Sequence, residues 1–158
     1  MIDKQETFNG TWPFEAKFCT SSGFLHHYVG EGDPDGEVVI CLHGEPTWGY
    51  LYRTMIPGLG KHYRVIVPDH MGFGKSETPQ NRIYTLKSHV ENLSLLIDDL
   101  ELNNITFVGQ DWGGPIAGAY ALKYPERVSR LCLLNTLLGY SGPLPNSNPT
   151  TWFKWIAK

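Results

Sequence analysis

Apolar residues recur along the chain in short runs that are separated by polar, glycine-containing segments. Four of these runs are almost wholly apolar, at 38–42, 65–67, 105–108 and 131–134. Strands that are covered on both faces, as in a parallel sheet, have this pattern because neither face meets water. We therefore predict a buried parallel sheet that contains these four segments.

The segments between the runs carry helical spacing. In residues 85–100 the apolar positions follow three- and four-residue steps, which places them on one face of a helix. Residues 115–124 are rich in alanine and end before Pro125, where a helix is expected to stop. Strand and helix thus alternate, which is typical of a doubly wound α/β fold.

Two shorter segments with alternating polarity precede the first apolar run. They lie near 15–20 and 24–29, and Ser21-Ser22-Gly23 between them favours a tight turn. We predict an antiparallel hairpin here, followed by a loop at 30–36, where glycine, aspartate and proline are concentrated.

Composition and charge narrow the functional classes. The 158 residues are 41% hydrophobic and 18% charged with a net charge of -3, which favours a folded domain and argues against a nucleic-acid partner. We see neither a secretory signal nor a membrane-spanning run, so a cytoplasmic protein without a membrane partner is expected. Cys41 and Cys132 lie in apolar runs, where buried, reduced thiols are expected.

The segment Gly109-Gln110-Asp111-Trp112-Gly113-Gly114 follows the 105–108 run and opens the alanine-rich helix. It has the form of a nucleophile elbow with aspartate where serine is more familiar. Flanking glycines suit a turn this sharp, because a Cβ atom would clash where strand and helix nearly touch. We predict that Asp111 is a nucleophile at the carboxyl end of the sheet; an aspartate that only caps the helix is the alternative.

Two further motifs follow predicted strands. His43-Gly44-Glu45-Pro46-Thr47-Trp48 comes after the 38–42 run, and Asp69-His70-Met71-Gly72-Phe73-Gly74-Lys75-Ser76 comes after the 65–67 run. The second ends like a phosphate-binding loop, but the glycine which that loop needs is replaced by Asp69. The dinucleotide pattern fails as well, because position 77 is glutamate. Both nucleotide-binding interpretations are therefore rejected.

The three motifs H-G-E-P-T-W, D-x-x-G-x-G-K-S and G-Q-D-W-G-G, in this order, closely resemble those of haloalkane dehalogenases. The resemblance covers residues 24–141. It implies the N-terminal part of an α/β-hydrolase core at 1–138 and the start of a helical cap domain at 139–158, cut short at the chain's end.

The resemblance also implies the roles of individual residues. Asp111 would be the catalytic nucleophile, and the backbone N–H groups of Glu45 and Trp112 would form an oxyanion hole. The halide would be bound by Trp112 and by Trp155, which lies in a W-F-K-W stretch with Trp152 where the family has phenylalanine. A small haloalkane, water and halide are the expected partners, without a cofactor or a metal ion.

An aspartate nucleophile indicates attack on a saturated carbon, since the resulting ester can be cleaved by water at its carboxyl carbon. In the family the histidine base follows the last strand. The acid of the triad occupies one of two positions, and the first of these is Asn135 here, which is not a carboxylate. No histidine of this chain fits that base. Two of the six belong to motifs, namely His43 and His70, and two are expected at the surface, namely His62 and His89. The remaining two, His26 and His27, are expected on opposite faces of a strand. The chain alone is therefore expected to lack turnover.

Two other interpretations remain open at this point. An epoxide hydrolase shares the fold and the Asp-Trp-Gly-Gly elbow, although Glu45-Pro46-Thr47-Trp48 argues against it. The chain could also be a non-catalytic fragment or pseudoenzyme, because no histidine base is found in it.

Overall fold

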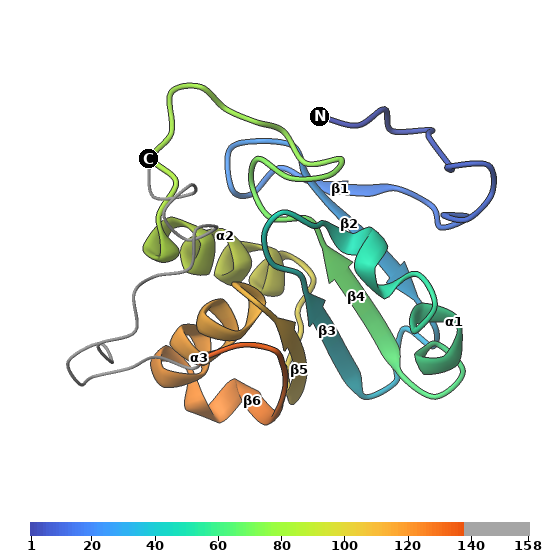
Figure 1. Ribbon diagram of the computed structural model, residues 1–158. Helices are drawn as coiled ribbons and strands as arrows, with labels where there is room; N and C mark the ends of the chain where they lie inside the picture. The colour runs from blue at the N-terminus through green and yellow to red at the C-terminus, as the bar shows by residue number, and fades with distance from the viewer. Residues whose placement is uncertain (138–158) are drawn as a thin grey trace.

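The computed structural model describes residues 1–137, which form a six-stranded sheet with helices on both faces (Figure 1). The strand order across the sheet is β1-β2-β4-β3-β5-β6. The pairs β1–β2 and β2–β4 are antiparallel, whereas β4, β3, β5 and β6 run parallel. The strands are β1 (Lys17–Cys19), β2 (His26–Glu31), β3 (Val38–Leu42), β4 (Arg64–Pro68), β5 (Ile105–Gln110) and β6 (Val128–Leu134). The predicted α/β fold is thus confirmed.

Five helical segments connect the strands. They are η1 (Gly49–Tyr52), α1 (Ile56–Leu59), α2 (Leu86–Asp99), α3 (Gly113–Lys123) and η2 (Pro125–Arg127). Helix α2 begins at a reciprocal cap: the Thr85 side chain accepts the Ser88 N–H at 3.1 Å, and the Ser88 hydroxyl accepts the Thr85 N–H at 2.9 Å. The short segments η1, α1 and η2 were not predicted, because a single turn leaves little periodicity in a sequence.

The predicted strands lie where the structure has them, with some differences at the ends. The 38–42 run coincides with β3. Strand β6 begins three residues before the predicted 131–134 run. The sequence did not indicate this start, because Ser129 and Arg130 interrupt the apolar pattern. The predicted turn of the hairpin is also present. The N–H of Gly23 donates to the Thr20 carbonyl at 2.8 Å, and Gly23 has a φ of 74°.

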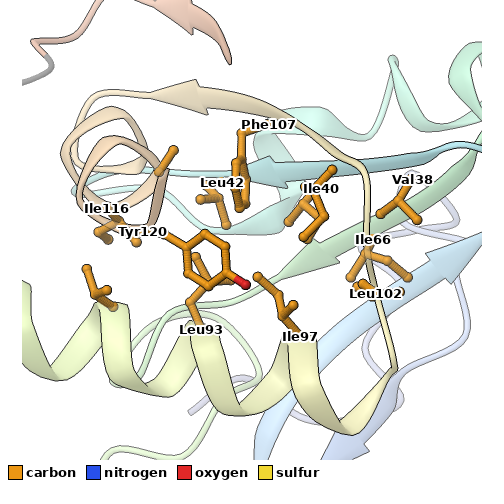
Figure 2. Close-up of a cluster of buried hydrophobic side chains, with 13 residues drawn as sticks. Val38, Ile40, Leu42, Ile66, Leu93, Ile97, Leu102, Phe107, Ile116 and Tyr120 are labelled. Atoms are coloured by element: carbon orange, nitrogen blue, oxygen red, sulfur yellow. The ribbon is translucent and has the colours of Figure 1, made fainter. Parts of the chain in front are cut away.

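Alternating residues of β3 build two separate cores. Val38, Ile40 and Leu42 face the side covered by α2 and α3, where they pack with Phe107 and Tyr120 (Figure 2). The residues between them face the opposite side, toward η1 and α1, in a second cluster that contains Val39, Cys41, Tyr52, Ile56 and Trp12. Burial on both faces explains why this strand is apolar throughout.

Strand β6 lies at the edge of the described sheet and is more exposed than its sequence suggests. Leu131, Leu133 and Leu134 are each more than a third exposed, and Cys132 is exposed as well. The prediction of a buried Cys132 is therefore wrong, whereas Cys41 in the central strand β3 is buried as predicted. An apolar run predicts a strand, but how deeply that strand is buried depends on whether it lies in the centre or at the edge of the sheet.

The core between α2 and the sheet gives a first testable prediction. Replacing Leu93 of α2, which is 2% exposed, by alanine is expected to lower the free energy of unfolding by about 2–5 kcal/mol, because it leaves a cavity. Leu122 of α3 is 86% exposed, so Leu122→Ala is the matched control and should change it by less than about 0.5 kcal/mol. Urea denaturation of both variants measures the difference, and equal effects would contradict the described packing.

Candidate active site

The three sequence motifs meet at one edge of the sheet. Strands β3, β4 and β5 are parallel neighbours that end at Leu42, Pro68 and Gln110, and each motif begins at or next to the end of its strand. Ligands of open α/β sheets bind at this carboxyl edge. Three segments far apart in the sequence are therefore brought to one place by the topology.

Asp111 lies at a sharp turn between β5 and α3. Its φ is 51°, in the left-handed region that residues with a side chain seldom adopt. The turn is held by two hydrogen bonds to the Asp111 carbonyl, one from the Gly114 N–H at 3.0 Å and one from the hydroxyl of Thr136, which follows β6. Local strain of this kind is found at functional sites.

The glycines around Asp111 are required by close contacts between backbones. A Cβ on Gly113 would lie 2.0 Å from the Leu42 carbonyl oxygen, and one on Gly109 would lie 2.8 Å from the Gly113 oxygen. Gly44 faces the nucleophile from the other side, where a Cβ would lie 2.3 Å from the Asp111 Cβ. The end of β3 is thus packed directly against the elbow.

This packing places the Asp111 carboxylate against the first motif. The backbone N–H of Glu45 donates to Asp111 Oδ1 at 2.9 Å. Trp112 follows Asp111 in the chain, precedes the first residue of α3 and is 46% exposed. The other predicted halide ligand, Trp155, and the predicted cap at 139–158 lie outside the described residues.

A pocket of about 340 Å³ opens beside these residues. Its wall combines the glycine loop after β3, the start of α3, the loop after β4 and the first turn of α2. The lining residues are Gly44, Glu45, His70, Phe73, Tyr84, Thr85, Leu86, His89, Trp112 and Ile116. Most of these side chains present carbon, which suits an apolar substrate.

A buried carboxylate, Asp69, organises the loop that forms one wall of this pocket. Its Oδ1 accepts the Gly49 N–H, and its Oδ2 accepts the Lys75 N–H and the His27 Nδ1–H, each at 2.8 Å. A Cβ on Gly74 would lie 2.2 Å from Oδ2, so the loop needs glycine there. The D-x-x-G-x-G-K-S motif is thereby explained as a structural loop around Asp69.

Lys75 has a structural role in the same loop. Its ammonium is buried and donates to the backbone carbonyls of Lys4 and Glu6, each at 2.8 Å. These bonds tie the N-terminal segment to the loop. Because its donors are directed at the chain itself, the structure agrees with the rejection of a phosphate-binding loop.

The comparison with known proteins decides the family. The α/β hydrolase fold family matches residues 37–157, well over half of the chain. The chain belongs to this family. A haloalkane dehalogenase of Mycobacterium marinum is 42% identical over 154 residues, which cover 92% of this chain and 50% of that protein. A cis-3-alkyl-4-alkyloxetan-2-one decarboxylase of Shewanella oneidensis is 40% identical over 149 residues, covering 92% and 45%.

Solved structures of the family agree. The haloalkane dehalogenase DpaA from Paraglaciecola agarilytica superposes with a TM-score of 0.82 at 36% identity, over 93% of this chain and 50% of that one. The epoxide hydrolase CorEH superposes with a TM-score of 0.76 at 29% identity, over 87% and 47%. The resemblance to haloalkane dehalogenases is thus confirmed. This α/β hydrolase spans about half the length of the curated relatives it matches.

The histidines of this α/β hydrolase differ partly from expectation. His62 is exposed as predicted, but His89 is half-buried and lines the pocket, so its placement at the surface was wrong. The helical spacing of α2 did not reveal this, because the pocket forms only where α2 meets the loop after β4. His70, assigned to a structural motif, also lines the pocket.

Within residues 1–137, no three histidine, cysteine or acidic side chains are grouped so that they could hold a metal ion. No helix in this part of the chain combines the length and the hydropathy needed to cross a membrane.

The Asp69 network predicts a pH-dependent contribution to stability. Burial alone would raise the pKa of Asp69, but the interactions with His27, together with those with His43 and the Lys75 N–H, outweigh it, so this pKa lies below its ordinary value. The stabilisation is therefore complete above about pH 4, the pKa of an unfolded aspartate, and is lost as the pH falls through the folded pKa.

Asp69→Asn should therefore lower the free energy of unfolding at neutral pH by about 1.5–3 kcal/mol, because it weakens the hydrogen bonds that the buried carboxylate accepts. The difference from the natural protein should narrow in acid. Asp35 is exposed, so Asp35→Asn serves as the control. Denaturation at several pH values measures both variants, and a cost for Asp69→Asn that stays constant into acid would contradict the assignment.

Proposed function

We propose that this α/β hydrolase carries the nucleophilic half of a haloalkane dehalogenase site. Asp111 attacks the carbon that bears the halogen, the carbon–halogen bond breaks with its electron pair, and an aspartyl ester and halide form. Water then attacks the carboxyl carbon of Asp111, which releases the alcohol and a proton. The observation that carries the proposal is the Asp111 carboxylate at a strained turn, held by the Glu45 N–H beside an apolar pocket.

The choice of aspartate fits displacement at a saturated carbon. Serine would form an ether there, which water does not readily cleave, whereas an ester can be hydrolysed at the carboxyl carbon. Asp111 lies two residues before the first residue of α3, and the N-terminal end of a helix attracts negative charge.

The Glu45 N–H is placed for the second step. When one carboxylate oxygen carries the alkyl group, the other becomes the ester carbonyl and gains negative charge as water attacks. Because Asp111 Oδ1 already accepts the Glu45 N–H, alkylation of Oδ2 would leave Oδ1 in place to be stabilised. We propose the N–H of Trp112, the next residue, as the second donor of this oxyanion hole.

We further propose that Trp112 and Trp155 bind the departing halide. Trp112 lines the pocket, and an indole N–H is a donor with no acceptor function, which suits an anion. Leu86, Ile116 and Phe73 line the same pocket with apolar side chains. We propose no cofactor for this reaction and no partner beyond a small haloalkane, water and halide.

The first prediction for this function is a covalent adduct. Incubation with 1-bromohexane should add one hexyl group to the chain, and because none of its histidines fits the base of the second step, we expect this adduct to persist without turnover. Intact-mass spectrometry detects it, and Asp111→Asn should abolish it. Bromide release without an adduct would show that a histidine of this chain acts as base. If neither an adduct nor bromide is detected, the result would favour a non-catalytic chain.

A parallel incubation with styrene oxide tests the epoxide hydrolase alternative, which the similarity to CorEH supports. An epoxide opens by the same attack, so an adduct formed with the epoxide but not with 1-bromohexane would replace the dehalogenase proposal.

A second candidate reaction is supported by the oxetanone decarboxylases among the relatives, of which the one from Shewanella oneidensis matches 92% of this chain. Asp111 would attack ring carbon 4 of a 3,4-dialkyl-oxetan-2-one, so that the ring carbon–oxygen bond breaks and a carboxylate is freed. Loss of carbon dioxide from carbon 3 would then form the alkene and expel the Asp111 carboxylate. This route consumes no water and needs no histidine base.

The two candidates differ in what this chain can complete. If it is a decarboxylase, a cis-3,4-dialkyl-oxetan-2-one should give the alkene and carbon dioxide with repeated turnover, because the second step regenerates Asp111. Gas chromatography of the headspace measures the alkene, with Asp111→Asn as the control. Stoichiometric alkylation by 1-bromohexane without any alkene from the oxetanone would favour the dehalogenase.

A further inference from the structure

His70 is the most buried of the polar side chains that line the pocket. It follows β4 by two residues, is 6% exposed and shares the pocket wall with Phe73, Leu86 and Ile116. A polar atom in such an apolar wall is costly unless a ligand or water satisfies it. Its hydrogen bonds therefore decide what the pocket presents to a substrate.

The partners of His70 fix which ring nitrogen carries the proton. Its Nε2 lies 2.8 Å from the backbone carbonyl oxygen of His43. A carbonyl only accepts, so Nε2 carries the hydrogen and donates it. In a neutral imidazole the other nitrogen, Nδ1, is then a bare acceptor.

The surrounding contacts hold this arrangement rigidly. The backbone N–H of His70 donates to His43 Nε2 at 2.9 Å, and His43 Nδ1 donates to the Gly44 carbonyl at 2.9 Å. The two rings lie 4.3 Å apart between centroids. Burial, with the nearby His43 and His89, lowers the pKa of His70 well below its ordinary value, so the ring stays neutral near pH 7.

The acceptor on His70 Nδ1 has no protein donor within residues 1–137. His89 of α2 lies beside it with ring centroids 5.6 Å apart in an edge-to-face arrangement, without a hydrogen bond between the rings. Because the ring of His70 lines the pocket, a group bound there can reach it.

The topology places His70 and Asp111 on different strands of the sheet. Strand β3 lies between β4, which leads to His70, and β5, which leads to Asp111. Two spacings between neighbouring strands, about 10 Å, separate the backbones of β4 and β5. His70 therefore belongs to the part of the pocket wall that follows β4, whereas Asp111 belongs to the elbow after β5.

We propose that His70 Nδ1 accepts a hydrogen bond from a hydroxyl group several carbons away from the carbon that Asp111 attacks, so that the site selects hydroxylated alkyl substrates over purely apolar ones. The inference rests on the proposed attack by Asp111. It adds a specificity-determining residue in the part of the pocket wall that follows β4. A substrate without the hydroxyl would displace water from this acceptor without replacing its hydrogen bond, which disfavours binding.

The test compares 6-bromohexan-1-ol with 1-bromoheptane, which differ only by a hydroxyl in place of a methyl group. Rates of Asp111 alkylation are measured by intact mass, and the ratio of the two rates is the readout. The ratio should favour the alcohol and fall about tenfold in His70→Leu, as expected for one buried hydrogen bond. His62→Leu, at an exposed histidine, is the matched control and should keep the ratio. An unchanged ratio in folded His70→Leu would overturn the inference.

A second measurement on the unaltered chain needs neither a variant nor a reaction. Nitrogen-15 NMR of the histidine rings should show His70 as the neutral Nε2–H tautomer at pH 7. Its Nδ1 resonance should move and saturate on addition of hexane-1,6-diol, but not with hexane. A proton on Nδ1, or no response to the diol, would overturn the inference. Absence of any alkylation would count against the proposed function alone, because the NMR result stands apart from it.

Discussion

The close approach of the end of β3 to the nucleophile elbow is the constraint on which the candidate site depends. A Cβ atom on Gly113 would clash with Leu42, and one on Gly44 would clash with Asp111, so both positions require glycine. Only at this separation does the Glu45 N–H reach Asp111 Oδ1. The contact joins two motifs that are more than sixty residues apart, so the electrostatic environment of the carboxylate is set by backbone packing. A backbone donor fixed in this way needs little reorganisation during a reaction.

The other wall of the pocket depends on a buried carboxylate. Asp69 joins β2 through His27, the segment after β3 through Gly49, and its own loop through Lys75. Lys75 in turn holds the N-terminal segment. Because this network orients the loop that carries His70 and Phe73, stability and pocket shape rest on the same group. The D-x-x-G-x-G-K-S motif is thus explained by this structural role, since Asp69 itself does not line the pocket.

Much of the fold could be predicted from local pattern. Strand β3 was bounded correctly, and α2 was placed within a residue at each end, because apolar runs and helical steps depend on near neighbours in the chain. The elbow was equally visible, since glycines at fixed offsets from Asp111 reflect a local turn. Exposure of Cys132 and burial of His89 were missed, because both depend on which elements lie alongside.

The sequence by itself determined the α/β architecture, the order of the three motifs and Asp111 as the candidate nucleophile, because periodicity and turn chemistry are properties of short segments. Only the tertiary structure decided that Glu45 donates to Asp111, that Asp69 is a structural carboxylate and that His70, whose Nε2 is bound to the His43 carbonyl, lines a pocket. Each of these facts is a contact between residues at least twenty positions apart, and its geometry follows from the order in which the strands lie side by side.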